Sequence, residues 1–299
     1  MKTHLEAWSL RGLLWCFGKL SPGFASTLGG RVARYIGRFL PSSRVAMVNL
    51  QRAFPAMSAV ERNTILANCW ENLGRTFAEL PHLATLPAHP DNGPGWYVLN
   101  EHILHHARMQ QRPILFFSGH LGNWELMPLI VARYGLAFSP FYRAPNNPLV
   151  DRLLCHLRRK LINEPVQFFP KGKEGALEAI RHLAKGGHLG VLGDQKMNDG
   201  IEVSFFGHPT MTAPATAALA LRFNALIVTG RVWRDGPARL TLEVCSCLDP
   251  HMMVPPSSSR QEKIRHLTQH LNDQLESWIT ERPSDWLWLH RRWEKKYYR

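Results

Sequence analysis

Short apolar runs that alternate with helical segments are the feature that most restricts the fold of this chain of 299 residues. Residues 113–117 read Pro-Ile-Leu-Phe-Phe, an apolar run of the kind that forms a buried strand. Similar runs at 190–193 and 226–232 each follow a segment with helical spacing, and residues 240–248 alternate like a half-exposed strand. Because strands that alternate with helices build parallel sheets, the sequence predicts an α/β fold with a mostly parallel central sheet flanked by helices.

Several helix starts are marked by their capping residues. Ser58 and Glu61 have the spacing of a capping box, and so do Ser259 and Glu262. Asn147 is followed by a proline, a pair that suits the N-cap and the first helical position. The remaining helices of the α/β part are expected at 101–110, 123–134, 174–185 and 214–223.

Helical spacing also extends over the first 80 residues, which precede the first predicted strand. Pro81 ends this region, and a loop rich in proline and glycine follows at 87–95. We therefore expect an N-terminal helical region over 1–85 and an α/β domain over 86–299.

A large excess of basic residues predicts an anionic partner. Lysine and arginine number 36 against 23 for aspartate and glutamate, which gives a net charge of +13. Such a charge attracts nucleic acid, anionic lipid headgroups or an acidic carrier protein. The ten tryptophans favour the lipid surface, since tryptophan suits places where one side of the ring is apolar and the other is wet.

The N-terminus has the composition of a helix that lies in a membrane surface. Its uncharged run, residues 12–18, lies between Arg11 and Lys19 and is shorter than the roughly 20 apolar residues that cross a bilayer. No convincing cleavage site follows, so we do not expect a secretory signal peptide. Aromatic side chains among arginines predict a membrane-associated helix instead. A helical hairpin packed on the core is the alternative.

Cysteine and histidine spacing predicts neither a disulfide framework nor a metal site. The five cysteines are scattered and odd in number, which fits reduced thiols in a cytosolic setting. Cys245 and Cys247 share one face of a predicted strand and have no second pair. His102, His105 and His106 lie on a polar helix without a suitably spaced carboxylate. We expect no metal.

Residues 118–125 carry the strongest chemical signal. They read Ser-Gly-His-Leu-Gly-Asn-Trp-Glu and lie where the first apolar strand gives way to a helix, the end of a strand at which α/β proteins bind ligands. A histidine held beside a carboxylate acts as a general base at neutral pH, so His120 and Glu125 are the candidates. With a hydroxyl substrate, no serine or cysteine nucleophile is required. The alternative is that both residues only cap a helix start.

The spacing of His120 and Glu125 resembles the H-x-x-x-x-D/E motif of the glycerolipid acyltransferase superfamily. More closely, the chain resembles the late acyltransferases of lipid A biosynthesis, the lauroyl and myristoyl transferases. This resemblance covers nearly the whole chain and implies that His120 and Glu125 form a catalytic dyad. The further blocks that carry it are Val-Asn-Leu-Gln-Arg-Ala-Phe-Pro at 48–55, 58–61, Asn-Leu-Gly-Arg at 72–75, Tyr-Arg-Ala-Pro-Asn-Asn-Pro at 142–148, Gly-Asp-Gln at 193–195, Phe-Phe-Gly at 205–207, Pro-Thr-Met-Thr at 209–212, and Trp-Leu-Trp-Leu-His-Arg-Arg-Trp at 286–293.

The resemblance also implies substrate-binding residues. Arg143 would bind or orient a phosphate or carbonyl oxygen, because a guanidinium carries a fork of donors that matches such oxygens. Asp194 would set the position of the substrate or the geometry of Arg143. Gly122 and Asn123, inside the motif, are expected to contact the substrate as well.

The implied reaction moves a fatty acyl chain from acyl carrier protein to a hydroxyl of a lipid A precursor or a related lysolipid. It needs no metal or organic cofactor. The implied partners are the carrier protein, an anionic lipid acceptor and the membrane surface, at the cytoplasmic face of a bacterial inner membrane.

Three other functions compete with this one. A different lipid acceptor, a lysophospholipid or a glycolipid, would leave the chemistry unchanged. Nucleic-acid binding is suggested by the interleaved basic and aromatic residues at 290–299, but no nucleic-acid module is recognisable, and we expect no nucleic-acid partner. A hydrolase with Ser118 as nucleophile lacks the glycines of a nucleophile elbow on both sides of the serine.

Overall fold

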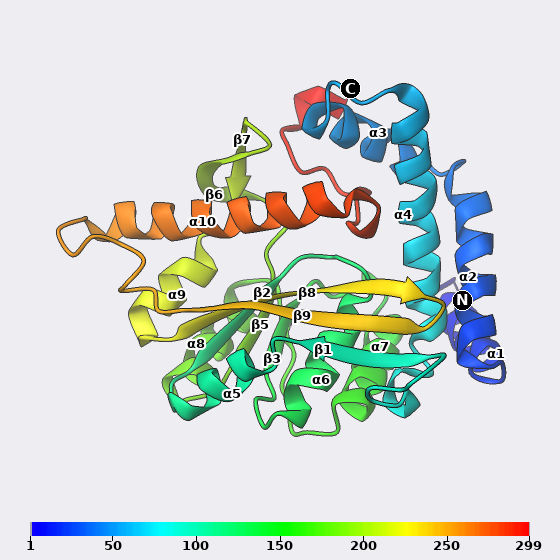
Figure 1. The fold of residues 1–299 in the computed structure, drawn as a ribbon, viewed down its shortest axis with the longest axis horizontal. Coiled ribbons are helices and arrows are strands. Elements are labelled where there is room, and N and C mark those ends of the chain that lie inside the picture. Colours follow the sequence, from blue (N-terminus) through cyan, green and yellow to red (C-terminus); the bar gives the residue numbers. More distant parts are fainter. Residues whose placement is uncertain (1, 299) are drawn as a thin grey trace.

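A seven-stranded sheet forms the centre of the computed structural model, which describes residues 2–298 (Figure 1). All neighbouring strands are parallel except β8 and β9, which form an antiparallel hairpin. The predicted α/β fold with a mostly parallel sheet is confirmed. The strand order is β1 (Gly95–Leu99), β9 (Arg239–Leu248), β8 (Leu226–Gly236), β2 (Ile114–Ser118), β5 (Leu189–Leu192), β3 (Ser139–Tyr142) and β4 (Phe169–Pro170).

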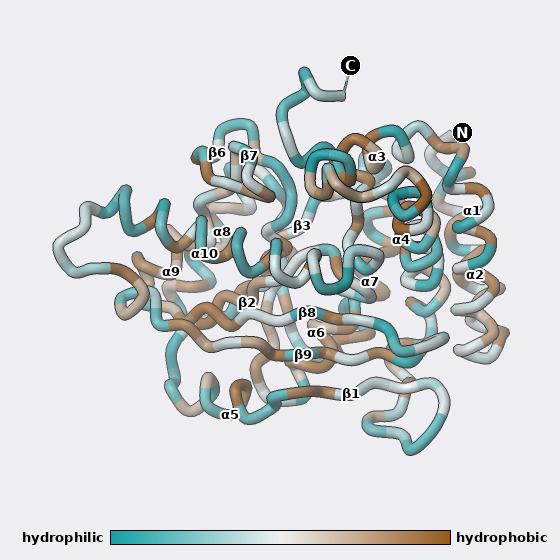
Figure 2. Tube along the Cα trace, turned by 45° about the horizontal axis from the view of Figure 1, so that its top comes forward, coloured by the Kyte–Doolittle hydropathy of each residue, from teal (hydrophilic) through white to brown (hydrophobic). Residues whose placement is uncertain are grey.

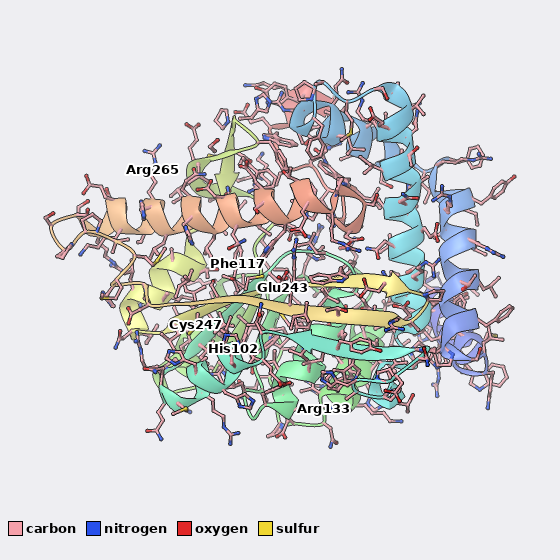
Figure 3. The ribbon with its side chains drawn as sticks, viewed as in Figure 1. His102, Phe117, Arg133, Glu243, Cys247 and Arg265 are labelled. Atoms are coloured by element: carbon pink, nitrogen blue, oxygen red, sulfur yellow. The ribbon has the colours of Figure 1, made fainter. Side chains whose placement is uncertain are left out.

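Strand β2 shows why the sheet has two buried faces. Side chains alternate between the faces of a strand, so Leu115 and Phe117 pack into a core that includes α10, while Ile114 and Phe116 pack into a core that includes α5 and α6. Phe117 lies between the sheet and α10, as Figure 3 shows. The helices of this part are α5 (His102–Met109), α6 (Met127–Arg133), α7 (Pro148–Ile162), α8 (Lys173–Ala184), α9 (Ala215–Phe223) and α10 (Arg260–Glu281).

The capping residues mark the helix starts that the sequence predicts. The Ser58 and Ser259 side chains each accept a hydrogen bond from the backbone N–H three residues later, and the glutamate at that position accepts one in return. Asn147 caps α7. The helix predicted over 123–134 begins later, because its first turn is the 3-10 turn η2 (Trp124–Leu126) and α6 starts at Met127.

Four helices precede the sheet: α1 (Lys2–Gly18), α2 (Pro22–Gly37), α3 (Ser42–Ala53) and α4 (Ala59–Glu79). Helices α2 and α4 pack closely because both carry glycine at their contact. A Cβ added to Gly74 would lie 2.2 Å from the carbonyl oxygen of Gly29. The short turn η1 (Leu83–Thr85) then leads to β1. The division into regions 1–85 and 86–299 stays a prediction.

Helices α1 and α2 expose large apolar side chains, and their apolar segments appear brown in Figure 2. Trp8 is 68% exposed, Trp15 65% and Phe24 57%. Within residues 2–298, no helix is long and apolar enough to cross a bilayer. This exposed face is where the sequence predicts membrane contact.

The C-terminal part of the chain crosses back over the sheet. The antiparallel pair β6 (Lys196–Phe205) and β7 (His208–Thr212) contacts α10, and the turns η3 (Pro283–Asp285) and η4 (Lys295–Tyr298) follow that helix. Trp288 and Trp293 are fully buried, and the Arg292 guanidinium donates to Thr210 and Thr212 inside the fold. Trp293 and Arg292 are therefore core residues and do not form a surface on which bases could stack.

Candidate active site

His120 lies in the turn that follows β2, and the C-terminal segment holds this turn from outside. The backbone N–H of Leu287 donates to the carbonyl oxygen of His120 at 3.0 Å. Leu121 pairs with Trp286 in an isolated β-bridge. The tryptophan-rich block near the C-terminus thus forms part of the wall around the histidine.

The carboxylate partner of His120 is Asp194. Its Oδ1 lies 2.8 Å from the imidazole Nδ1, and its Oδ2 accepts the backbone N–H of His120 at 2.9 Å. Asp194 follows β5, and β5 lies beside β2 in parallel, so the two strand ends bring the residues together. The indole Nε1 of Trp286 donates to the same Oδ2 at 2.8 Å. Because an ionised carboxylate only accepts, Nδ1 carries the proton and Nε2 is the free base.

Burial and charge act in opposite directions on the two groups. Burial disfavours the imidazolium, but the attraction of Asp194 outweighs it and raises the pKa of His120. Burial also disfavours the aspartate anion, yet the charge and hydrogen bonds of His120 hold the pKa of Asp194 well below its usual range. The pair is therefore poised so that the imidazole gains a proton readily and the aspartate keeps its charge.

Glu125 is paired with Arg158 of α7. Its two carboxylate oxygens accept from Nε at 2.8 Å and from Nη2 at 2.5 Å, the bidentate geometry of a guanidinium and a carboxylate. Burial would raise the pKa of Glu125, but Arg158 lowers it overall. Among residues 2–298, no hydrogen bond joins Glu125 to His120, although its charge is close enough to help raise the histidine pKa. Glu125, the expected dyad partner of His120, thus lies near the histidine but is paired with Arg158.

Gly122 and Asn123 are buried in the turn and form hydrogen bonds with α4. The Asn123 amide nitrogen donates to Glu79 at 2.8 Å, and the Gly122 carbonyl accepts from Asn72 and Thr76. Neither residue lines the cavity described below. This placement differs from the substrate contact that the sequence leads us to expect.

A large cavity of about 990 Å³ opens beside His120. Its wall is mostly aromatic and aliphatic, and it includes His120, Glu125 and Arg158. Arg143, the arginine predicted to bind substrate, also lines it. Further lining residues, from the sheet, from the segments just before β3 and β4, and from α7, α8, α9 and α10, are Phe116, Phe117, Phe138, Phe141, Leu161, Phe168, Ile180, Leu219 and Leu271.

Three residues of the site were not singled out from the sequence. Arg158 and Trp286 bind the two carboxylates, and His290 lines the cavity with its ring centroid 5.9 Å from that of His120. Burial, with the nearby charge of His120, lowers the pKa of His290. Trp286 and His290 lie in the C-terminal block 286–293, so the resemblance of this block to the family could have pointed to both residues. Arg158 is one of several basic residues on an ordinary amphipathic helix, and nothing in the sequence distinguishes it from the others.

In the part of the chain that the structure describes, no three His, Cys, Asp or Glu side chains are grouped as a metal site. The pair of His120 and Asp194 combines an imidazole that can act as a general base with a carboxylate that orients it. Beside an apolar cavity whose wall includes arginines such as Arg143 and Arg158, this pair can take a proton from a hydroxyl while an acyl chain and an anionic group are held nearby.

Comparisons with known proteins match this chain to acyltransferases. The model of the bacterial lipid A biosynthesis acyltransferase family matches residues 2–295. Lipid A biosynthesis acyltransferase 1 of Shigella flexneri is 25% identical over 276 residues, which cover 90% of this chain and 80% of the relative. The lipid A biosynthesis myristoyltransferase of Escherichia coli (strain K12) is 24% identical, with the same coverage of both chains.

A relative with a different acceptor in its name matches a shorter stretch. Phosphatidylinositol mannoside acyltransferase of Mycobacterium tuberculosis (strain ATCC 25618 / H37Rv) is 24% identical over 177 residues, which cover 58% of this chain and 52% of the relative. The resemblance that the sequence motifs suggest is confirmed by the family match over nearly the whole chain. The chain belongs to the bacterial lipid A biosynthesis acyltransferase family.

Proposed function

We propose that this protein transfers a fatty acyl chain from acyl carrier protein to a hydroxyl of a lipid A precursor. The observation that carries the proposal is the position of His120, which is oriented by Asp194 and lies in the wall of an apolar cavity of about 990 Å³. Sites of this size, with few polar groups in an apolar wall, are typical of small-molecule and lipid ligands.

In the proposed reaction, Nε2 of His120 takes the proton of the acceptor hydroxyl. The hydroxyl oxygen then attacks the carbonyl carbon of the thioester and forms a tetrahedral intermediate. As the carbon–sulfur bond breaks, the imidazolium returns its proton to the departing thiolate. Asp194 stabilises the imidazolium between these two steps, and its hydrogen bond to Nδ1 keeps Nε2 directed at the hydroxyl.

The arginines in the cavity wall would recognise the charged part of the substrates. Arg143 is exposed at the cavity, and Arg158 is fixed by Glu125. We assign Glu125 two tasks: it keeps Arg158 in place, and its negative charge favours the protonated state of His120. A guanidinium held in this way suits a phosphate of the acceptor or the carbonyl oxygen of the thioester.

We also propose that the protein works at the cytoplasmic face of a bacterial inner membrane. The exposed apolar side chains of α1 and α2 support membrane contact, with basic residues such as Arg11 and Arg31 close by in the sequence. The net charge of +13 suits both an anionic lipid surface and an acidic carrier protein.

The test is a transfer assay with purified protein, acylated acyl carrier protein and a lipid A precursor in mixed micelles. We expect an acylated lipid product by mass spectrometry, and a rate that falls as salt rises, since steering of an acidic donor is screened. Acyl-CoA should be the poorer donor. A lysophospholipid and a mannosylated phosphatidylinositol serve as competing acceptors. Faster transfer to either of these would contradict the lipid A precursor as the acceptor.

A further inference from the structure

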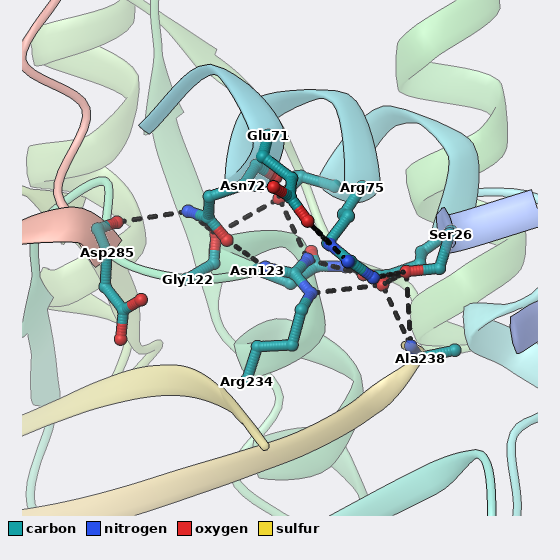
Figure 4. Close-up of polar contacts among 11 residues, drawn as sticks. Ser26, Glu71, Asn72, Arg75, Gly122, Asn123, Arg234, Ala238 and Asp285 are labelled. Atoms are coloured by element: carbon teal, nitrogen blue, oxygen red, sulfur yellow. Dashed lines mark hydrogen bonds and ion pairs between the residues drawn. The ribbon is translucent and has the colours of Figure 1, made fainter. Parts of the chain in front are cut away.

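A buried polar network contacts Gly122 and Asn123, two residues of the turn between His120 and Glu125 (Figure 4). Its centre is the carboxylate of Glu79, at the end of α4, which is 0% exposed. One oxygen accepts from Ser26 at 2.6 Å, from Arg234 Nε at 3.1 Å and from the backbone N–H of Ala238 at 3.2 Å. The other accepts from Arg234 Nη2 at 2.6 Å and from the Asn123 amide at 2.8 Å. Both oxygens of this anion therefore accept more than one hydrogen bond.

Gly122, which precedes Asn123 in the turn, is also held by residues of α4. The Gly122 carbonyl accepts from the amide of Asn72 at 3.2 Å and from the hydroxyl of Thr76 at 3.1 Å. Its N–H donates to the carbonyl of Asp285 at 3.0 Å. Gly122 has φ of +54°, and an added Cβ would lie 2.1 Å from the carbonyl oxygen of Val232, so only glycine fits here.

Arg234 makes the network continuous. Besides Glu79, its guanidinium donates to the side chains of Asn72 and Thr76, the two residues that hold Gly122. Arg234 lies near the end of β8, so the central sheet, α4 and the turn meet at one ion pair. A buried ion pair adds little net stability compared with apolar residues of the same size, whereas it does fix directions through its hydrogen bonds.

We propose that Glu79 is a positioning residue for acyl transfer: through Asn123 it holds the turn that presents His120 and Glu125 to the cavity. The inference rests on the proposed function. Asn123 stands between the two side chains in the sequence, and its contact with Glu79 is the only hydrogen bond of its side chain among the described residues. A displacement of about 1 Å in such a turn can cost roughly 100-fold in rate, because the base must meet the hydroxyl at hydrogen-bond distance.

The network also joins the turn to α2. Ser26 of α2 is fully buried and donates to Glu79, while Phe24 and Leu28 of the same helix are exposed. The helix that we expect to touch the membrane therefore shares one carboxylate with the turn of the active site.

The first test is Asn123→Ala, which removes the contact but leaves the ion pair intact. We expect kcat to fall about 10- to 100-fold with KM nearly unchanged, because substrate contacts are kept while the base is misplaced. Ser26→Ala should have a smaller effect in the same direction. The matched control is Glu243→Gln, which breaks the Arg231–Glu243 ion pair on the same β-hairpin and touches no residue of the turn. This control should lower the melting temperature and leave kcat unchanged.

Exchanging the carboxylate and the amide between positions 79 and 123 tests whether their contact affects the rate or only the stability of the fold. Glu79→Gln leaves Arg234 without its carboxylate, and Asn123→Asp places two carboxylates side by side, so each single variant should be impaired. In the double variant the glutamine amide donates to the aspartate, and one negative charge remains near Arg234. We expect the double variant to recover at least fivefold in kcat over the product of the single effects, a coupling that independent sites do not show.

The outcomes distinguish this inference from the function on which it rests. If the wild-type protein and Glu243→Gln form no acylated product, the proposed function fails, and the network loses its role in it. If both are active and folded Asn123→Ala has wild-type kcat, KM and pH profile, then Glu79 and Asn123 serve the fold alone and the inference is overturned. If Glu79→Gln does not fold, Asn123→Ala and Ser26→Ala decide between the two outcomes.

Discussion

The imidazole Nδ1 of His120 lies 2.8 Å from Oδ1 of Asp194, and this contact determines how the histidine can act. With the Nδ1 proton held by Asp194, the lone pair of Nε2 is left free to accept a proton. Glu125, five residues after the histidine, forms a bidentate pair with Arg158. The two carboxylates near the base thus have different surroundings, and variants of each should differ in their effects.

Asp194→Asn should remove most of the activity. The amide can present its N–H to Nδ1 and favour the wrong tautomer, and the imidazolium loses the adjacent negative charge. We expect kcat to fall by roughly 10²–10⁴-fold, similar to the effect of His120→Ala. Steady-state kinetics on protein whose folding is verified by thermal melting would measure this. Folded Asp194→Asn with nearly normal turnover would exclude the aspartate from the mechanism.

The pH profile should report the His120 pKa. Because Asp194 raises this pKa above its ordinary value of 6.5, the free base forms only at higher pH. The ratio kcat/KM should therefore rise with pH along a limb whose midpoint lies above 6.5. In Asp194→Asn the burial of the ring is no longer opposed by the aspartate, so the midpoint should move to lower pH. A limb at the same pH in both proteins would show that another group controls the rate.

Breaking the Glu125–Arg158 pair should harm both stability and activity. Glu125→Gln leaves a largely buried guanidinium without its anion, a change that typically costs ~3–5 kcal/mol when the pair is buried. Arg158→Lys keeps the charge but loses the bidentate geometry, so we expect a smaller loss of stability and a clear loss of kcat/KM. Melting temperatures and kinetics of both variants, with Arg112→Lys at the Arg112–Asp249 pair as a control, would test this. An equal loss of kcat/KM in the control would mean that the site has no special need for Arg158.

The volume of the cavity should limit the acyl chain. Ile180 of α8 lines it, whereas Leu177 on the same helix is 45% exposed and does not. Ile180→Trp fills part of the cavity, so we expect a preference for a shorter acyl chain than in the wild-type protein. Leu177→Trp adds the same ring on the outer face and should leave chain preference unchanged. Competition between acyl donors of different length, read by mass spectrometry, gives the answer. Unchanged preference in Ile180→Trp would place the acyl chain elsewhere.

Membrane contact should depend on the exposed aromatic residues of the first two helices. Trp8 and Trp15 of α1 and Phe24 of α2 are each more than half exposed. Replacing Trp8 and Trp15 by serine should weaken binding to anionic vesicles roughly tenfold, since each ring would lose apolar burial in the lipid surface. Met109→Gln, at an apolar side chain that is 80% exposed on α5, is the control. Equal sedimentation of all three proteins with vesicles would count against this face.

Local features of the fold could be predicted from the sequence because they depend on neighbouring residues. The two capping boxes need only a serine and a glutamate three positions apart, and both are present as predicted. The run at 113–117 is apolar on both faces of the strand, so a central parallel strand was the expected result. Five strands, β1, β3, β4, β6 and β7, were not predicted. Strands β3 and β4 have only four and two residues, and β1 begins at the last residue of the loop rich in proline and glycine. Strands β6 and β7 pair only with each other, outside the central sheet, so the alternation of strands and helices did not predict them.

The motif around His120 and the sequence blocks of the family could also be recognised in the sequence. They depend only on which residues follow one another along the chain and not on their contacts. What only the tertiary structure decided is the partner of each charged group. Asp194 is 74 positions from His120, and Arg158 is 33 positions from Glu125. Parallel strands β2 and β5 bring the first pair together, and α7 brings the second. Sequence spacing does not specify which side chains from distant parts of the chain come into contact, because the packing of helices and strands sets the distances between them.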